Sequence, residues 1–140
     1  MLLTLGVVGY SQGMYFDDKQ RKNSGRYLME TLRELNLTPQ QKRYIANILK
    51  ESRDKVKEIE KQIFELRMEN YEILRNYPPD KKKFLTNQEK ISDLLKQIHI
   101  IRAEGYINIL SVLDSEQYRI FIDRMRPKFK PPFDEEKIME

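Results

Sequence analysis

The feature that most constrains the fold is a long stretch of chain without a helix breaker. No Gly or Pro occurs between Gln40 and Asn76, and apolar or small residues recur there in alternating three- and four-residue steps. We call this stripe the seam; it consists of Ile45, Ile48, Ser52, Val56, Ile59, Ile63, Leu66, Asn70 and Ile73. The spacing predicts one α-helix more than ~50 Å long. Such a helix is not stable alone in water, so the seam must pack against a partner.

A second long helix is predicted after a proline-containing stop. Tyr77-Pro78-Pro79-Asp80 ends the first helix, because proline lacks an amide donor and disfavours helical geometry in the residue before it. Thr86 to Glu89 has the spacing of a capping box, and three lysines in a first turn would oppose the helix dipole, so we expect the next helix to begin at Thr86 rather than Asp80. Its apolar face comprises Ile91, Leu94, Leu95, Ile98, Ile101, Ile109 and Val112.

The C-terminal half of this second long helix carries a further apolar row. The row comprises Ala103, Tyr106, Leu110 and Leu113, which predicts that this half is covered from two sides. Gly105 lies in the same half and costs roughly 1 kcal/mol relative to Ala in a helix. We therefore expect another backbone to pass close to Gly105.

Short helices are predicted on both sides of this pair. The first begins near Ser24, a suitable N-cap, and ends near Asn36; the last spans about 114–126 and precedes the prolines that begin at Pro127. The predicted fold is all-α: a long antiparallel helical hairpin with short flanking helices. The domain is expected to span residues 24–126.

The two ends of the chain have different compositions from the helical region. Residues 1–13 begin with the apolar run MLLTLGVVG and then offer small residues at a cleavage site after Ser11, so they are interpreted as a truncated or atypical signal peptide. A buried strand or an apolar chain end is the alternative. Residues 14–23 are expected to form a flexible leader and residues 127–140 a flexible tail.

Composition excludes several classes of function. The chain has no Cys and one His, His99, which leaves no disulfide, thiolate metal site or multi-histidine site. No catalytic triad, pair of catalytic carboxylates or phosphate-binding glycine loop can be assembled, so we expect no enzymatic activity and no cofactor. The net charge of +4 is distributed among mixed signs, and the one tight cluster, Lys81-Lys82-Lys83, is interpreted as a solvated loop rather than a nucleic-acid site.

Two related pentapeptides occupy equivalent positions before two helices. Leu37-Thr38-Pro39-Gln40-Gln41 precedes the first long helix, and Leu113-Asp114-Ser115-Glu116-Gln117 precedes the last short one. In each, Thr38 or Asp114 can accept a hydrogen bond from the third amide, while Gln41 or Gln117 can reach back to the capping residue. Both pentapeptides are therefore predicted to start helices.

The repetition of these motifs across a helical hairpin resembles the Spy/CpxP family of small periplasmic proteins, which carry two LTxxQ motifs. The first pentapeptide matches the pattern in full, whereas the second has Asp114 in place of Thr. The resemblance covers roughly residues 25–126. It implies a cradle-shaped homodimer that works without ATP in the periplasm, binds unfolding client proteins and belongs to a stress response. Some relatives bind metals through His and Cys, but His99 alone does not support that role here.

Two alternative functions remain open from the sequence. A CpxP-like regulator would bind the sensor domain of an envelope-stress kinase through the same kind of surface. A cytoplasmic coiled-coil adaptor would use residues 1–13 as a structural end. In none of these interpretations does the mature chain span a membrane, because the N-terminal apolar run is too short.

A candidate client-binding surface lies beside the seam. The residues follow one another at helical spacing and combine aromatic, thioether and guanidinium groups: Phe64, Met68, Tyr71 and Arg75, with Arg67 adjacent. Methionine repacks easily and arginine contacts acidic or aromatic groups, which suits adaptable binding. Burial of the same row in a dimer interface or in the core is the competing interpretation.

Overall fold

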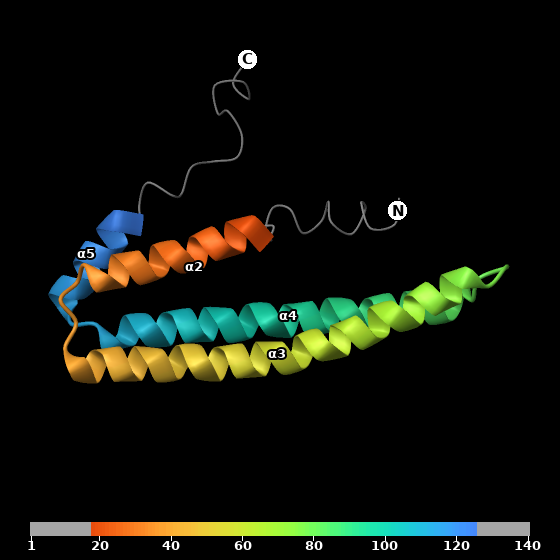
Figure 1. Cartoon of the computed structure of the whole chain (residues 1–140), viewed down its shortest axis with the longest axis horizontal. Helices are drawn as coiled ribbons and strands as arrows, with labels where there is room; N and C mark the ends of the chain where they lie inside the picture. Colours follow the sequence, from red (N-terminus) through yellow and green to blue (C-terminus); the bar gives the residue numbers. More distant parts are fainter. Residues whose placement is uncertain (1–17, 126–140) are drawn as a thin grey trace, which may run out of the picture. The chain divides into compact units, whose positions relative to one another are not determined.

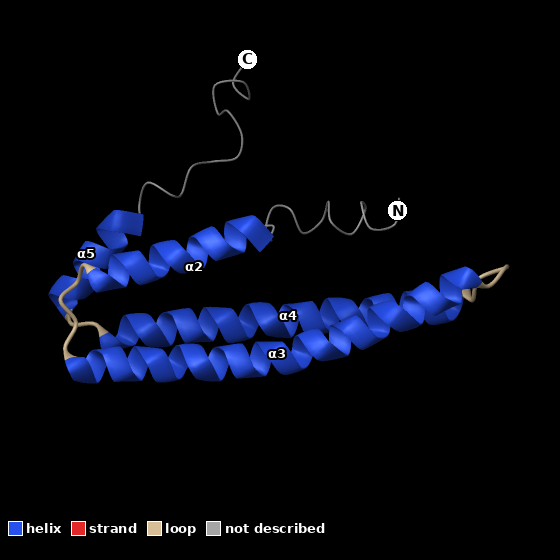
Figure 2. Cartoon of the chain, in the orientation of Figure 1, coloured by secondary structure: helices blue, strands red, loops and turns tan. Residues whose placement is uncertain are grey.

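A computed structural model describes residues 18–125, with side chains described from residue 26 onward. The described residues form four α-helices and no strand: α2 (Asp18–Arg33), α3 (Pro39–Arg75), α4 (Lys81–Val112) and α5 (Ser115–Met125) (Figures 1 and 2). The predicted all-α class and the long helix pair are confirmed. The predicted segments 1–13 and 127–140, and residues 14–17 of the predicted leader, lie outside the described residues.

The helices form two compact units. Thr38–Asp114 is one unit and contains α3 and α4, which lie side by side along their length (Figure 1). The other unit contains α2 and α5, which contact each other. Each unit is described below by itself.

The seam of α3 is buried as predicted. All nine of its positions are fully or partly buried, and the apolar core of the pair consists of Val56, Ile59 and Ile63 from α3 with Ile91 and Ile98 from α4. Partly buried leucines and an isoleucine surround this core: Leu66, Leu94, Leu95 and Ile101. Burial of this apolar surface supplies the stability that a solitary helix of this length lacks.

Two contacts show the register of the pair. Asn70 on α3 meets Asn87 on α4, and Ser52 meets Gly105. The segment from 52 to 70 on α3 is as long as the segment from 87 to 105 on α4, so the helices keep one antiparallel register without a slip. A Cβ atom built on Gly105 would lie 2.6 Å from Ser52 Oγ. A close contact is therefore present at Gly105, but side-chain atoms of Ser52 make it rather than the backbone that the sequence predicted.

The prediction that α4 begins at Thr86 is wrong. The helix begins at Lys81, and Asp80 is its N-cap: the Asp80 carboxylate accepts a hydrogen bond of 3.1 Å from the Lys83 amide. An aspartate at this position satisfies an otherwise unpaired amide and offsets the lysine charges near the helix dipole. Thr86 instead lies inside the helix, where its hydroxyl donates to the Lys82 carbonyl.

The second apolar row on α4 is only partly buried. Leu110 and Leu113 are buried and Tyr106 is half-buried, but Ala103 is exposed. The predicted burial of this row therefore holds at Leu110 and Leu113 and is wrong at Ala103. Alanine is a strong helix former, so its place in an exposed turn needs no packing partner.

The unit of α2 and α5 departs from the sequence prediction at the start of α2. The helix begins at Asp18, so it includes Ser24, the predicted N-cap, and residues 18–23 of the predicted leader. Those residues include Lys, Gln and Arg, which favour helix without any apolar periodicity. The helix ends at Arg33, and Asn36 follows with a left-handed φ of 53° that asparagine tolerates.

Three contacts hold α5 against the end of α2. The Tyr27 hydroxyl donates to the Arg124 carbonyl at 2.9 Å, Arg124 forms an ion pair with Glu34, and Gln117 bonds the Leu35 carbonyl. Phe121 is completely buried. The last helix spans Ser115–Met125, close to the predicted range 114–126.

Candidate functional site

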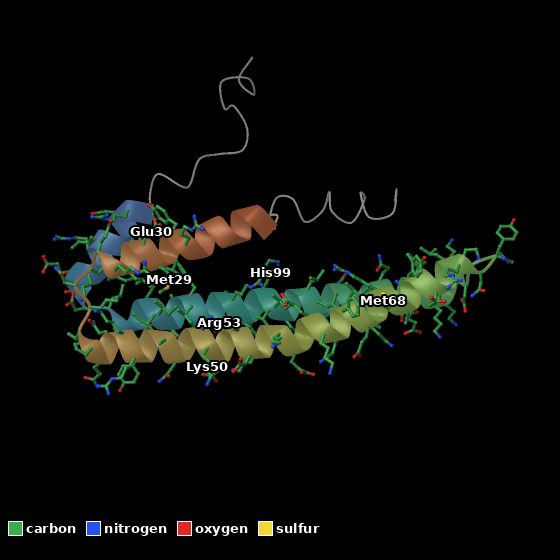
Figure 3. The ribbon with its side chains drawn as sticks, in the orientation of Figure 1. Met29, Glu30, Lys50, Arg53, Met68 and His99 are labelled. Carbon is green, nitrogen blue, oxygen red and sulfur yellow. The ribbon has the colours of Figure 1, made fainter. Side chains whose placement is uncertain are left out.

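The predicted row on α3 exposes three large apolar side chains. Phe64, Met68 and Tyr71 are 63%, 48% and 58% exposed, and Figure 3 shows Met68 in the half of α3 nearer the α3–α4 loop. Because successive helical residues are turned by ~100°, these three lie together on one flank of the seam. They are not part of the core of the described chain.

Two arginines accompany this row. Arg67 and Arg75 are both exposed, and Nη1 of Arg75 lies 3.4 Å from Oε1 of Glu72, an exposed pair that contributes little to stability. The row therefore combines three large apolar side chains with cationic groups that can reorient. We call Phe64, Arg67, Met68, Tyr71 and Arg75 the α3 row.

The opposite flank of the seam carries a polar groove that the sequence did not indicate. A groove of about 480 Å³ lies between α3 and α4, lined by Gln62, Glu65, Leu66, Glu69, Lys90, Asp93, Leu94 and Gln97. Carboxylates outnumber lysine among these residues. The two flanks of α3 thus differ in chemistry: one is apolar with arginines, and the other is polar and acidic.

A polar network joins the two helices near their loop. Asn87 Nδ2 donates to Asn70 Oδ1 at 2.9 Å, and Asn70 Nδ2 lies 3.3 Å from Gln88 Oε1 and 3.4 Å from the Phe84 carbonyl. Both asparagines are buried. The buried amides are thereby paired, which is the condition under which such groups are tolerated in a core.

Glu69 extends this network to the surface. Its carboxylate lies 3.0 Å from Lys83 Nζ. The hydrogen bond from Lys83 lowers the pKa of Glu69 below its ordinary value, with a smaller contribution from Asn87. Lys83 is therefore part of the helix contact, in contrast to the solvated loop that the sequence suggested for Lys81–Lys83.

The first pentapeptide caps α3 as predicted. Thr38 Oγ1 accepts from the Gln41 amide at 3.1 Å, and Gln41 Oε1 accepts from the Thr38 amide at 2.9 Å, which is a capping box. Gln41 has a further contact that the sequence did not indicate: its Nε2 donates to the Val112 carbonyl at 3.0 Å. The side chain therefore also ties the start of α3 to the end of α4. Leu37, directly before the cap, is half-buried.

The second pentapeptide shares this bridging contact. Asp114 directly precedes α5, and Gln117 Nε2 donates to the Leu35 carbonyl at 3.2 Å from a buried position. Leu113, which precedes Asp114, is buried and ends α4. In each motif the glutamine amide thus reaches a carbonyl at or just beyond the end of another helix, which satisfies an acceptor that the helix leaves unpaired.

The described residues contain no group of three or more His, Cys, Asp or Glu side chains arranged to hold a metal ion. His99 is half-buried on α4. None of the helices between residues 18 and 125 is both long and apolar enough to cross a membrane.

Comparisons of the chain with protein-family models, curated proteins and solved structures found no match. The resemblance to the Spy/CpxP family therefore depends on the two pentapeptides, their order and the helix lengths between them.

Proposed function

We propose that this protein is an ATP-independent periplasmic chaperone that binds unfolding proteins on the α3 row and limits their aggregation. The observation that carries this proposal is the exposure of Phe64, Met68 and Tyr71 on a helix whose seam packs against α4. An exposed apolar row on a rigid support is available for binding without any rearrangement of the core.

The chemistry of the row supports binding of many different clients. Met68 can adjust its shape, the rings of Phe64 and Tyr71 bury large apolar areas, and Arg67 can contact acidic or aromatic groups. No single shape or sequence is selected by such a surface. The same properties suit recognition of exposed apolar segments in proteins that have begun to unfold.

Client capture on this surface has two physical stages. Long-range attraction by the basic residues acts first and is screened over ~8 Å at physiological salt and ~3 Å at 1 M. Apolar burial, worth ~25 cal/mol per Å², then determines how long the client stays and survives high salt. Association with an acidic unfolded client should therefore slow as salt rises, whereas release should depend on the apolar side chains.

The experiment replaces Phe64, Met68 and Tyr71 together by Ser and measures association and release by stopped flow. We expect faster release and an almost unchanged salt dependence of association. The matched control replaces Tyr44, Ile100 and Ile107 by Ser, since these are exposed to a similar degree outside the α3 row. Equal effects of both triple variants, or binding confined to one sensor-kinase domain, would contradict the proposal.

A homodimer is part of the same proposal, because a cradle formed by two chains offers a larger client surface. Light scattering at micromolar concentration should give the mass of two chains; a monomer would contradict it. If the α3 row were the dimer interface, the Phe64, Met68 and Tyr71 triple variant would dissociate, whereas the Tyr44, Ile100 and Ile107 variant would not.

Periplasmic localisation is tested at the N-terminus. Mass spectrometry of the protein from its native host should find a processed chain that lacks the apolar run. An intact chain recovered from the cytoplasm would favour an adaptor function instead.

A further inference from the structure

The loop that joins α3 to α4 lies at the end of the helix pair (Figure 1). Tyr77 is 97% exposed, and Leu74 and Leu85, on the helices that flank the loop, are 48% and 49% exposed. The loop and the two helix ends beside it thus expose three large apolar side chains within twelve residues of chain. We call Leu74, Tyr77 and Leu85 the apolar tip.

Basic residues occur in the same segment as the apolar tip. Residues 74–85 contain Arg75, Lys81, Lys82 and Lys83 against Asp80 alone, so this short segment carries most of the chain's net charge of +4. Lys83 pairs with Glu69 and Arg75 with Glu72, whereas Lys81 and Lys82 make no ion pair within residues 26–125. Two lysine charges beside Tyr77 are therefore available to an anionic partner.

An exposed tyrosine next to unpaired lysines suits the surface of an anionic lipid bilayer. Tyrosine favours the boundary between headgroups and acyl chains, where its ring contacts the acyl chains and its hydroxyl lies in the hydrated headgroup region. Lysine stems can lie along apolar surface while the ammonium groups reach the phosphates above. Basic residues next to such a surface are attracted by its negative potential.

The exposure of Tyr77 favours a bilayer over a folded protein as the partner. A side chain exposed on almost every side stands clear of its own chain, so a protein partner would need a preformed pocket shaped to it. A bilayer interface is fluid and adapts to a protruding side chain without such a pocket. We propose that the α3–α4 tip docks this protein on anionic membrane surfaces, with Tyr77 inserted at the interface and Lys81 and Lys82 on the lipid phosphates. This inference is independent of the proposed chaperone function.

The absence of tryptophan provides a direct test. Tyr77→Trp in the full chain places a single fluorescent reporter at the tip, and Tyr44→Trp places one elsewhere in the same unit as a control. With phosphatidylglycerol vesicles, we expect a blue shift for Tyr77→Trp and quenching by brominated acyl chains, and neither for Tyr44→Trp. Phosphatidylcholine vesicles should leave both spectra unchanged, because they lack the negative surface charge.

Vesicle co-sedimentation then measures how much the lysines and Tyr77 each contribute to membrane binding. Each basic residue near an anionic surface raises partitioning about fivefold at low salt, so Lys81→Gln with Lys82→Gln should weaken binding roughly 25-fold. The matched control, Lys50→Gln with Lys57→Gln, removes the same charge from exposed positions of α3 and should change binding less than about threefold. Tyr77→Ser should weaken binding about fivefold and reduce its resistance to salt.

Two results would overturn the proposal. One is equal loss of binding in the tip and control lysine variants, which would mean that only overall charge matters. The other is binding to poly-glutamate or single-stranded DNA with no quenching of Tyr77→Trp by lipid, which would assign the tip to a soluble polyanion. Because all substituted side chains are exposed, circular dichroism should show the same helix content in every variant.

Discussion

The middle of the α3–α4 pair and its loop end are held together by different physical means. In the middle, Val56, Ile59 and Ile63 pack against Ile91 and Ile98 without a buried polar group among them. Near the loop, Asn70 and Asn87 bond each other, and Glu69 pairs with Lys83 at the surface. Both regions follow the same antiparallel register.

The difference shows how stability and register are divided along one helix pair. Apolar burial is large but non-directional, so the middle would tolerate a shifted alignment of its isoleucines. A buried asparagine pair contributes less, but a slip by one turn would leave its amides unpaired. We therefore expect the middle to supply most of the stability and the loop end to specify the alignment.

The largest predicted effect comes from the middle. Ile63→Ala should destabilise the protein by about 2–5 kcal/mol, because Ile63 is buried and its removal leaves a cavity. Phe64→Ala, one residue along, should change stability by no more than about 0.5 kcal/mol, since that side chain is exposed. Urea unfolding measures both; similar losses would break the distinction between the core and the α3 row.

The next effect comes from the asparagine pair. Asn70→Leu should cost about 1–3 kcal/mol, because the Asn87 amide loses its buried acceptor. Replacing both asparagines by Leu should be close to neutral in stability but should relax the register. Asn108→Leu, at an exposed site of α4, is the control for a change in side-chain polarity alone.

The register itself can be measured by cross-linking, since the chain has no cysteine. A Cβ on Gly105 would lie 3.5 Å from Ser52 Cβ, within the range of a disulfide. Ser52→Cys with Gly105→Cys should therefore cross-link readily in the native background. The yield should fall when Asn70 and Asn87 are both Leu; an unchanged yield would mean that the apolar middle fixes the register by itself.

A smaller effect is expected where α3 and α4 approach most closely. Gly105→Ala gains up to about 1 kcal/mol of helix propensity but brings its Cβ to 2.6 Å from Ser52 Oγ. The gain should appear in full when Ser52 is Ala and be reduced when Ser52 is present. A double-mutant cycle measured by thermal unfolding gives the coupling, and additive effects would show that Ser52 rotates away at no cost.

The smallest effect concerns pH at the loop end. The hydrogen bond from Lys83 is the chief reason why the pKa of Glu69 is lower in the folded protein than its unfolded value near 4.5. The ionised Glu69 therefore stabilises the fold above the unfolded pKa, and this stabilisation is lost as pH falls through the folded pKa. Glu69→Gln and Lys83→Gln should each remove this part of the acid dependence of unfolding. A dependence that persists in both variants would point to another carboxylate.

The sequence predicted the interior of the helix pair better than the helix starts. Periodicity predicts the seam, and the distinctive backbone chemistry of proline and glycine predicts the stop at Pro78 and a close contact at Gly105. These features could therefore be predicted from the sequence alone. The start of α2 was misplaced because residues 18–23 are charged or polar and carry no apolar periodicity. At Asp80 and Thr86 two capping residues competed, and the aspartate prevailed.

The candidate sites also differ in how far the sequence predicts them. The place of the α3 row beside the seam and the capping box at Thr38 could be predicted from spacing on one helix, whereas the exposure of the row could not. The contact from Gln41 to Val112 and the groove beside Lys90 join residues from two helices, so they required the register of the pair. Sequence spacing on a single helix does not contain that register.

The constant register also implies an order of folding. Contacts near the loop join residues as few as 14 positions apart, whereas the Gln41 contact at the other end closes 71. The entropic cost of loop closure increases with that separation. Pairing that starts beside Pro78 and proceeds toward Thr38 therefore has the smallest entropic cost at each step. The asparagine pair would then form early and select the alignment before the isoleucines can pack in a wrong one.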